Sequence, residues 1–277
     1  YELLRSRVGS EMCIRDRSSM PVRRERGPVL LACDLDGTLF DDDGLPLPGV
    51  GEAVAEIVGA GAHFVVVTGR PLRSARRATT LLGVEPVVYA CFHGALIVEA
   101  CGRILRHTPL PGRDARQVVR RALTEGVAVT VWDADGPREI EPVGGSHVPV
   151  ARLVGDEVSR LVLHGEPGTV ARLFTGLRRE WRGRLQARSV RPGFLEVLAP
   201  QVDKGDALRF VTTALGVAGE RTVACGDDAA DESLLTAAAV RIAVGESPHP
   251  LAGIPEVIVT ARGRLPDVLR AKVRSLR

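Results

Sequence analysis

Lysine is nearly absent from this chain of 277 residues, and aromatic side chains make up only 4% of it. Of its 37 lysine and arginine residues only Lys204 and Lys272 are lysines, so a lysine at a motif position is more informative than an arginine. No apolar run is long enough to cross a bilayer, which predicts a soluble protein without a membrane partner. The net charge of +3 is small and the basic residues are dispersed, so we predict no nucleic-acid partner.

Cysteine patterns typical of metal or redox sites are also missing. The five cysteines, at positions 13, 33, 91, 101 and 225, form no CxxC pair, and no Cys/His spacing fits zinc. Two of them each end an apolar run and suit a buried core, so we predict a reducing, cytoplasmic setting. No GxGxxG follows the first predicted strand, which disfavours a nucleotide-binding dehydrogenase.

The first nineteen residues contribute no core pattern. The stretch from Met12 to Asp16 resembles the translation of a common sequencing adapter. We predict that residues 1–19 are a non-native segment and that Met20 is the native start. The alternative is a targeting peptide, but the segment lacks an apolar stretch of about 7–15 residues, and acids interrupt its basic residues.

Apolar runs and helical patterns alternate in the two outer parts of the chain. Such alternation predicts a parallel sheet with right-handed crossover connections. Residues 111–199 differ, because several short predicted strands and two helices indicate an antiparallel α+β domain. We therefore predict an α/β fold in which a doubly wound parallel-sheet core, formed by residues 20–110 and 200–277, carries residues 111–199 as an inserted α+β cap domain.

Two carboxylates follow the first predicted strand, in the stretch Asp34-Leu35-Asp36-Gly37-Thr38-Leu39. In open α/β sheets the ligand crevice lies at the carboxyl ends of the strands, so one carboxylate can act as nucleophile and the other as acid/base. Mg²⁺ held by oxygen ligands would prevent the two charges from raising each other's pKa. For this stretch alone, an Asx-turn after a strand is the simpler alternative.

Further polar residues stand at the ends of other predicted elements: Thr68 and Gly69, Lys204, and Asp227 with Asp231. Those that follow strands of one parallel sheet can converge on one crevice. Each has a structural alternative: Thr68 can cap a helix, Lys204 can be a solvated surface residue, and the two aspartates can be ordinary helix acids.

Four stretches in this order resemble the motifs of the haloacid-dehalogenase-like superfamily. They are DLDGTL at 34–39, VVVTGR at 65–70, the single Lys204 that opens a helix, and GDDAAD at 226–231. The resemblance covers essentially residues 28–277. The insertion lies where type-IIB members carry an α/β cap, and the residues from Phe194 to Leu208 closely resemble the Cof-type branch.

The resemblance implies a role for each of these positions. Asp34 attacks phosphorus and forms an aspartyl-phosphate, while Asp36 protonates the leaving oxygen and then deprotonates the hydrolytic water. The Thr68 hydroxyl, the Gly69 amide and Lys204 hold the phosphate. Asp34, the carbonyl of Asp36 and Asp227 ligate Mg²⁺, and Asp231 supports the metal site.

The resemblance implies a Mg²⁺-dependent phosphomonoester hydrolase whose substrates are small phosphorylated metabolites, sugar phosphates among them. Rivals are a trehalose-phosphate phosphatase, a phosphomutase and a catalytically silent module that binds phospho-ligands. The chain departs from the Cof-type pattern at Ala230 and at His93, where that branch commonly has asparagine. We expect the cap to decide substrate choice; the oligomeric state is not predicted.

Overall fold

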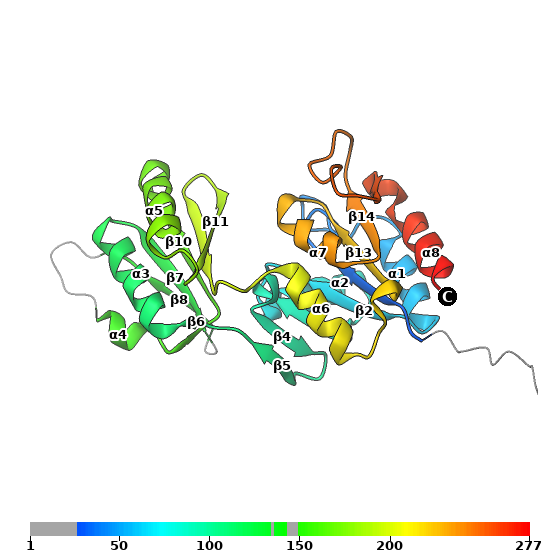
Figure 1. The fold of residues 1–277 in the computed structure, drawn as a ribbon, viewed down its shortest axis with the longest axis horizontal. Coiled ribbons are helices and arrows are strands. Elements are labelled where there is room, and N and C mark those ends of the chain that lie inside the picture. Colours follow the sequence, from blue (N-terminus) through cyan, green and yellow to red (C-terminus); the bar gives the residue numbers. More distant parts are fainter. Residues whose placement is uncertain (1–26, 134–135, 143–148) are drawn as a thin grey trace, which may run out of the picture.

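The structure is a computed structural model that describes residues 27–133, 136–142 and 149–277. The predictions for residues 1–19 and for Met20 lie outside the described residues. Two large sheets organise the chain: one lies in the core (residues 27–107 and 202–277) and the other in the cap (residues 110–198) (Figure 1). Within the described ranges, no helix is long and apolar enough to cross a membrane.

The core sheet has eight strands in the order β15-β14-β13-β1-β2-β3-β4-β5. Its strands are β1 (Leu30–Cys33), β2 (His63–Val67), β3 (Val88–Cys91), β4 (Leu96–Glu99), β5 (Ile104–His107), β13 (Thr222–Gly226), β14 (Val240–Val244) and β15 (Val257–Thr260). The six strands from β15 to β3 are parallel, and the β4–β5 hairpin extends this sheet in antiparallel fashion. The predicted parallel core is confirmed.

Helices cover both faces of this sheet, because its central strands are apolar on both sides. In β1, Leu31 and Cys33 pack into one hydrophobic cluster, and Leu30 and Ala32 into another. The first cluster includes residues of α1 (Val50–Gly59), α2 (Leu72–Leu82) and α8 (Leu265–Ser275). The second includes residues of α6 (Lys204–Ala214) and α7 (Glu232–Ala237). The fold is therefore doubly wound, as predicted.

The cap sheet has five antiparallel strands in the order β11-β12-β10-β7-β8. Its strands are β7 (Ala128–Asp133), β8 (Gly136–Ile140), β10 (Arg160–His164), β11 (Gln186–Arg191) and β12 (Phe194–Leu198). Two short strands, β6 (Leu110–Pro111) and β9 (Glu157–Val158), form a separate antiparallel pair in the cap. The cap helices are α3 (Gly112–Thr124), α4 (Val150–Leu153) and α5 (Pro167–Glu180). Strand β8 was not predicted; Pro137 is tolerated there because β8 is an edge strand.

Side chains of the cap sheet alternate between two faces. Val131, Leu161 and Val197 pack with α3 and α5 in the cluster that fills the cap. Their strand neighbours Trp132, Arg160 and Glu196 therefore lie on the opposite face. The chain enters the cap after β5 and returns to the core just before α6 (Figure 1).

Short 3₁₀ turns complete the core. They are η1 (Phe92–Gly94), η2 (Gly219–Arg221), η3 (Ala229–Asp231) and η4 (Arg262–Arg264). Two of them, η1 after β3 and η3 after β13, begin at the carboxyl ends of parallel strands, where the predicted site residues lie.

Candidate active site

Three of the predicted site residues follow three adjacent parallel strands. Asp34 follows β1, Thr68 follows β2 and Asp227 follows β13, and the sheet order places β1 between the other two. The Asp34 amide continues the ladder by donating to the Cys225 carbonyl oxygen at 3.0 Å. Adjacent parallel strands thus bring together side chains that are almost two hundred residues apart in the sequence.

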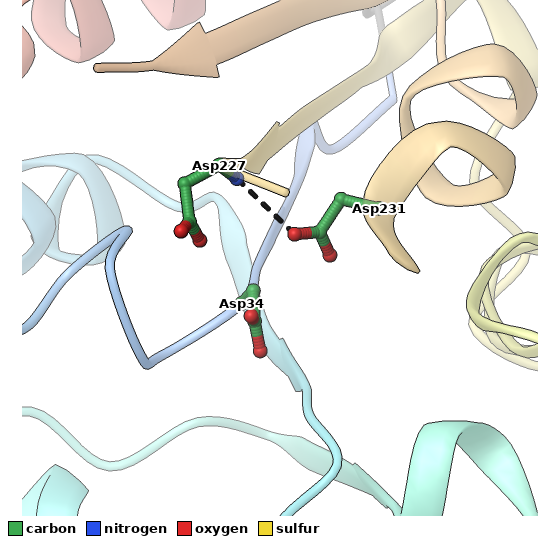
Figure 2. A group of neighbouring side chains, drawn as sticks. All are labelled: Asp34, Asp227 and Asp231. Atoms are coloured by element: carbon green, nitrogen blue, oxygen red, sulfur yellow. Dashed lines mark hydrogen bonds between the residues drawn. The ribbon is translucent and has the colours of Figure 1, made fainter. Parts of the chain in front are cut away.

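Three carboxylates gather at this edge of the sheet. Asp34, Asp227 and Asp231 each offer an oxygen within 4.8 Å of the others (Figure 2). Asp231 is fully buried, and its Oδ2 accepts the amides of Asp227 (3.1 Å) and Asp228 (3.3 Å). Asp231 therefore fixes the loop that carries Asp227.

Gly37 is required for Asp227 to come this close to the first loop. Its φ is +76°, and a Cβ at this position would lie only 2.0 Å from Asp227 Oδ2. A side chain here would be strained and would also displace the carboxylate. Thr38 completes the contact, since its hydroxyl donates to Asp227 Oδ1 at 2.8 Å.

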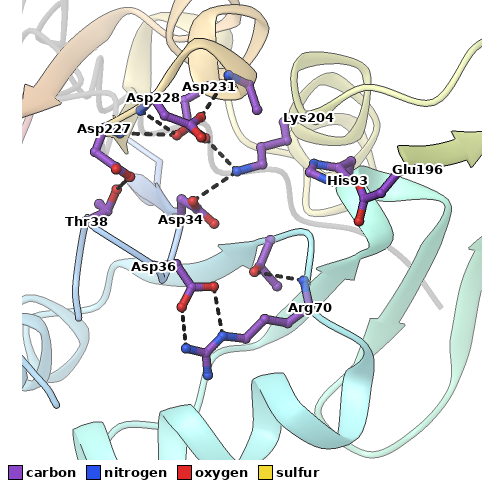
Figure 3. A network of polar contacts seen from close by, with 12 residues as sticks. Asp34, Asp36, Thr38, Arg70, His93, Glu196, Lys204, Asp227, Asp228 and Asp231 are labelled. Carbon is purple, nitrogen blue, oxygen red and sulfur yellow. Dashed lines mark hydrogen bonds and ion pairs between the residues drawn. The ribbon is translucent and has the colours of Figure 1, made fainter. Parts of the chain in front are cut away.

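Lys204 lies between two of these carboxylates (Figure 3). Its Nζ is 3.0 Å from Asp34 Oδ2 and 2.7 Å from Asp231 Oδ1, and its side chain is buried. Burial acts to lower the pKa of Lys204, but the two carboxylates outweigh it and hold the pKa above its usual value. Lys204 is therefore a fixed cation beside Asp34.

Asp34 is placed for reaction. Burial raises its pKa to about 7, although the charge of Lys204 opposes that rise. One oxygen is engaged by Lys204, while the other, Oδ1, is buried without a hydrogen-bond partner. Burial likewise raises the pKa of Asp227 to about 6, although the Thr38 hydrogen bond opposes that rise; the charges of Asp231 and Asp228 add smaller upward effects. A cation bound to these oxygens would offset the repulsion between the negative charges of the neighbouring carboxylates.

The predicted phosphate-binding loop follows β2. Thr68 is fully buried, and its Oγ1 accepts the Arg70 amide at 3.1 Å, so the hydroxyl hydrogen remains able to donate. Gly69 packs so closely against His93 that a Cβ at Gly69 would lie 2.8 Å from His93 Nε2. Sequence reasoning left His93 outside the site, although its place beside Gly94 after a strand resembled that of the strand-end residues.

The structure separates the Asp36 carboxylate from the group of three. The Arg70 Nε donates to Asp36 Oδ2 at 2.9 Å, and Arg70 Nη2 bonds the other oxygen (Figure 3). The Asp36 side chain is 59% exposed. The sequence prediction gave the metal the Asp36 carbonyl rather than its carboxylate. The sequence did not predict the pairing of Arg70 with Asp36, because arginine is abundant in this chain.

Two cap residues that the sequence did not identify as site residues reach this region. Glu196 Oε2 lies 3.1 Å from His93 Nε2, and Arg160 Nη1 donates to the Gly69 carbonyl oxygen at 3.0 Å.

Ala230, where the sequence departs from the Cof-type pattern, lies in η3 of the core and donates its amide to Asp228 Oδ1 at 2.8 Å.

The chain has clear relatives among known proteins. The sequence model of the family described as haloacid dehalogenase-like hydrolase matches residues 31–137 and 148–261. A putative phosphatase, YxeH, of Bacillus subtilis is 23% identical over 84% of this chain and 90% of its own length. A phosphoglycolate phosphatase of Methanopyrus kandleri is 27% identical over the same shares, 84% and 90%.

Solved structures share the fold over nearly the whole chain. The subclass IIB sugar phosphatase BT4131 superimposes with a TM-score of 0.71, at 17% identity, over 90% of this chain and 100% of its own. At this identity the likeness concerns the fold, which includes a core with an inserted cap.

Proposed function

The chain belongs to the haloacid dehalogenase-like hydrolases, and on that basis we propose that it is a phosphatase that hydrolyses small phosphorylated metabolites, sugar phosphates among them. The observation that carries the proposal is Asp34, a buried carboxylate with one free oxygen, held beside Lys204 at the edge of the sheet. The names of the relatives and of the sugar phosphatase with the same fold support phosphate esters as substrates.

In the proposed first step, a carboxylate oxygen of Asp34 attacks phosphorus and the bond to the leaving oxygen breaks. Asp36 gives its proton to that oxygen, so the alcohol leaves neutral. In the structure Asp36 is a carboxylate paired with Arg70, so it must first rotate away from Arg70 and take up a proton from solvent, and its exposure allows both. In the second step Asp36 takes a proton from water, which attacks phosphorus and frees Asp34 and inorganic phosphate.

The proposed phosphate-binding groups are the Thr68 hydroxyl, the Gly69 amide and Lys204. Phosphoryl transfer depends mostly on positioning and on charge stabilisation. A phosphate dianion facing Asp34 would be repelled without a nearby cation, and Lys204 is a buried cation already paired with Asp34. Burial also reduces screening by water, which strengthens this interaction.

The acidic residues fit Mg²⁺, which prefers a few carboxylates with further oxygen ligands. Asp34 Oδ1 is buried without a partner, and Asp227 and Asp231 offer oxygens within 4.8 Å. We propose that Asp34, the Asp36 carbonyl and Asp227 hold the ion and that Asp231 supports it. When bound, Mg²⁺ would neutralise charge on the phosphate and on Asp34.

The cap is proposed to be a separate domain, residues 111–199, that selects the substrate. Each residue with a proposed chemical role lies in the core, at the end of a core element. The cap sheet presents polar side chains on the face opposite its helices, where they can meet the organic part of a substrate. A closing cap would also exclude water from the crevice.

Phosphate release from an aryl phosphate tests the function. We expect turnover with Mg²⁺, and its loss when the metal is chelated. A protein that binds inorganic phosphate but releases none from any ester would instead be a binding module. Transfer of the phosphoryl group back to the organic substrate would indicate a phosphomutase, and a panel of metabolites that includes trehalose phosphate identifies the substrate.

Metal binding has a readout besides activity. Protons compete with a cation for Asp34 and Asp227, whose pKa values are raised to about 7 and about 6. Raising the pH removes these protons, so the rise in Tm caused by Mg²⁺ should be larger at pH 7.5 than at pH 5. Equal rises at both pH values would contradict a site built from these carboxylates.

A further inference from the structure

The cap contacts the core at the loop that follows β2. Arg160, the first residue of β10, is buried, and its Nη1 donates to the Gly69 carbonyl oxygen (3.0 Å) and to Glu196 Oε1 (2.6 Å). Its guanidinium carbon lies 4.9 Å from the ring centroid of Phe92 in the core and 5.3 Å from that of Trp132 in the cap. These contacts hold the buried cation in one position.

The charges of this contact are balanced within it. Glu196 Oε2 also meets His93 Nε2 at 3.1 Å, so one carboxylate joins a cap arginine to a core histidine. Burial acts to raise the pKa of Glu196, but His93 and Arg160 hold it below the usual value. Burial lowers the pKa of His93, so the histidine is neutral at physiological pH and the ion pair is Glu196 with Arg160.

On the core side the backbone is strained. Phe92 and His93 have φ values of 50° and 58°, which side chains other than glycine rarely adopt. Their amides donate to the carbonyl oxygens of Arg70 (3.3 Å) and Thr68 (2.9 Å), which joins this turn to the phosphate-binding loop. Such strain persists only where the surroundings determine the conformation, and here the surroundings include the loop of Thr68.

The Gly69 carbonyl belongs to the peptide unit whose other end supports the Thr68 hydroxyl. The Arg70 amide of that unit donates to Thr68 Oγ1 at 3.1 Å. Rotation about the Cα–C bond of Gly69 would move both ends together, and glycine has no side chain to restrict it. Alanine does not fit, because His93 occupies the space of a Cβ. The restraint on this peptide unit therefore comes from outside the loop.

We propose that Arg160 is a positioning residue: by holding the Gly69 carbonyl, it fixes the Arg70 amide of the same peptide unit and so keeps the Thr68 hydroxyl in the orientation that binds the substrate phosphate. This inference rests on the proposed phosphatase function. It separates Arg160 from other cap residues, which would contact the organic part of a substrate. Loss of the Arg160 donor must then impair all phosphate esters to a similar extent, including a small aryl phosphate.

The test compares two variants, R160M/E196Q and the matched control E196Q. The double variant removes the donor to Gly69 without leaving an unpaired charge in the interior. The control keeps that donor but leaves the Arg160 cation without its carboxylate, and its Tm reports the cost in stability. The measurements are kcat/KM for an aryl phosphate and for the best metabolite, the inhibition constant of inorganic phosphate, and Tm. For the double variant we expect a loss of about 10–100-fold on both substrates and similarly weaker phosphate inhibition. The control should stay within about threefold of the wild type in both kcat/KM values and in the inhibition constant of phosphate.

Three results would overturn the proposal. The double variant could match the control, which would leave Arg160 without a role in the loop. The loss could be confined to the metabolite, which would make Arg160 a contact to the organic part. Should the double variant not fold, R160K replaces it, because lysine keeps a cationic donor at this position. An inhibition constant of phosphate within about threefold of the wild type supports the proposal, and a larger increase refutes it. A wild-type protein without phosphatase activity would instead refute the proposed function itself.

Discussion

The core and the cap place their polar side chains by different rules. In the core, Asp34, Thr68 and Asp227 each follow a strand, and because the strands are parallel their ends meet at one edge. In the cap, Arg160 and Glu196 lie within antiparallel strands, on the face opposite the helices. A parallel sheet thus assembles a site from strand ends, whereas an antiparallel sheet presents its polar residues by alternation.

In the proposed function the core performs the chemistry and the cap selects the substrate. Asp34 gives the strongest test of this division. Asp34→Asn should lower kcat for an aryl phosphate by about 10⁴-fold or more, because the amide is no nucleophile. Folding should persist, since the substitution removes a carboxylate whose charged form burial disfavours. The measurements are kcat with Mg²⁺ present and Tm. Turnover within tenfold of the wild type would remove the chemistry from this residue.

Lys204 should give the next largest effect. Lys204→Met removes the cation between Asp34 and Asp231 and should lower kcat by about 10²–10³-fold. It leaves two buried carboxylates unpaired, so stability should fall by about 3–5 kcal/mol. The matched control is the same substitution at Lys272, the other lysine, which is only partly buried on α8. Equal effects of the two substitutions on kcat would show that Lys204 serves the fold alone.

Gly69 provides a smaller test at the boundary of the two regions. A Cβ at Gly69 would lie 2.8 Å from His93 Nε2, so Gly69→Ala should displace the phosphate-binding loop. A displacement of this kind costs on the order of 10²-fold in kcat/KM. The control is Gly59→Ala in α1, where no atom lies within 4 Å of the new Cβ and activity should be unchanged. An active G69A variant with normal phosphate inhibition would show that the loop tolerates this shift.

The cap should give the smallest effect on an aryl phosphate and a clear one on substrate choice. Arg188 lies on the cap-sheet face of Glu196, and its Nη2 donates to the Gln186 Oε1 and the Val202 carbonyl oxygen, at 2.9 and 3.1 Å. Arg188→Met should change turnover of the preferred metabolite by about tenfold, and that of an aryl phosphate far less. The control is Arg178→Met on the exposed side of α5. Equal losses on every substrate would contradict a selective role.

The two regions also differ in how far the sequence predicts them. The parallel core, its helices and the convergence of Asp34, Thr68 and Asp227 were predictable, because residues that end adjacent parallel strands must meet. The place of Lys204 in the site was predictable because this residue opens a helix in a chain with almost no other lysine. The roles proposed for these residues remain predictions.

Contacts between the two regions were not predictable. Arg160 meets Gly69, and Glu196 meets His93, across 91 and 103 residues of sequence, and neither pair stands at strand ends in both regions. The Arg70 pairing with Asp36 was hidden because arginine is the usual cation of this chain. Local patterns identify elements, but the face on which an inserted sheet meets its core follows from packing.

The central claim is that phosphoryl transfer proceeds through Asp34 in the core, in two displacements at phosphorus. The stereochemical course of hydrolysis tests it directly, with an ester whose phosphorus is made chiral by oxygen isotopes and water of the third isotope. Each in-line displacement inverts phosphorus, so transfer first to Asp34 and then to water predicts overall retention of configuration. Overall inversion would mean that water attacks the substrate directly, and it would contradict the account.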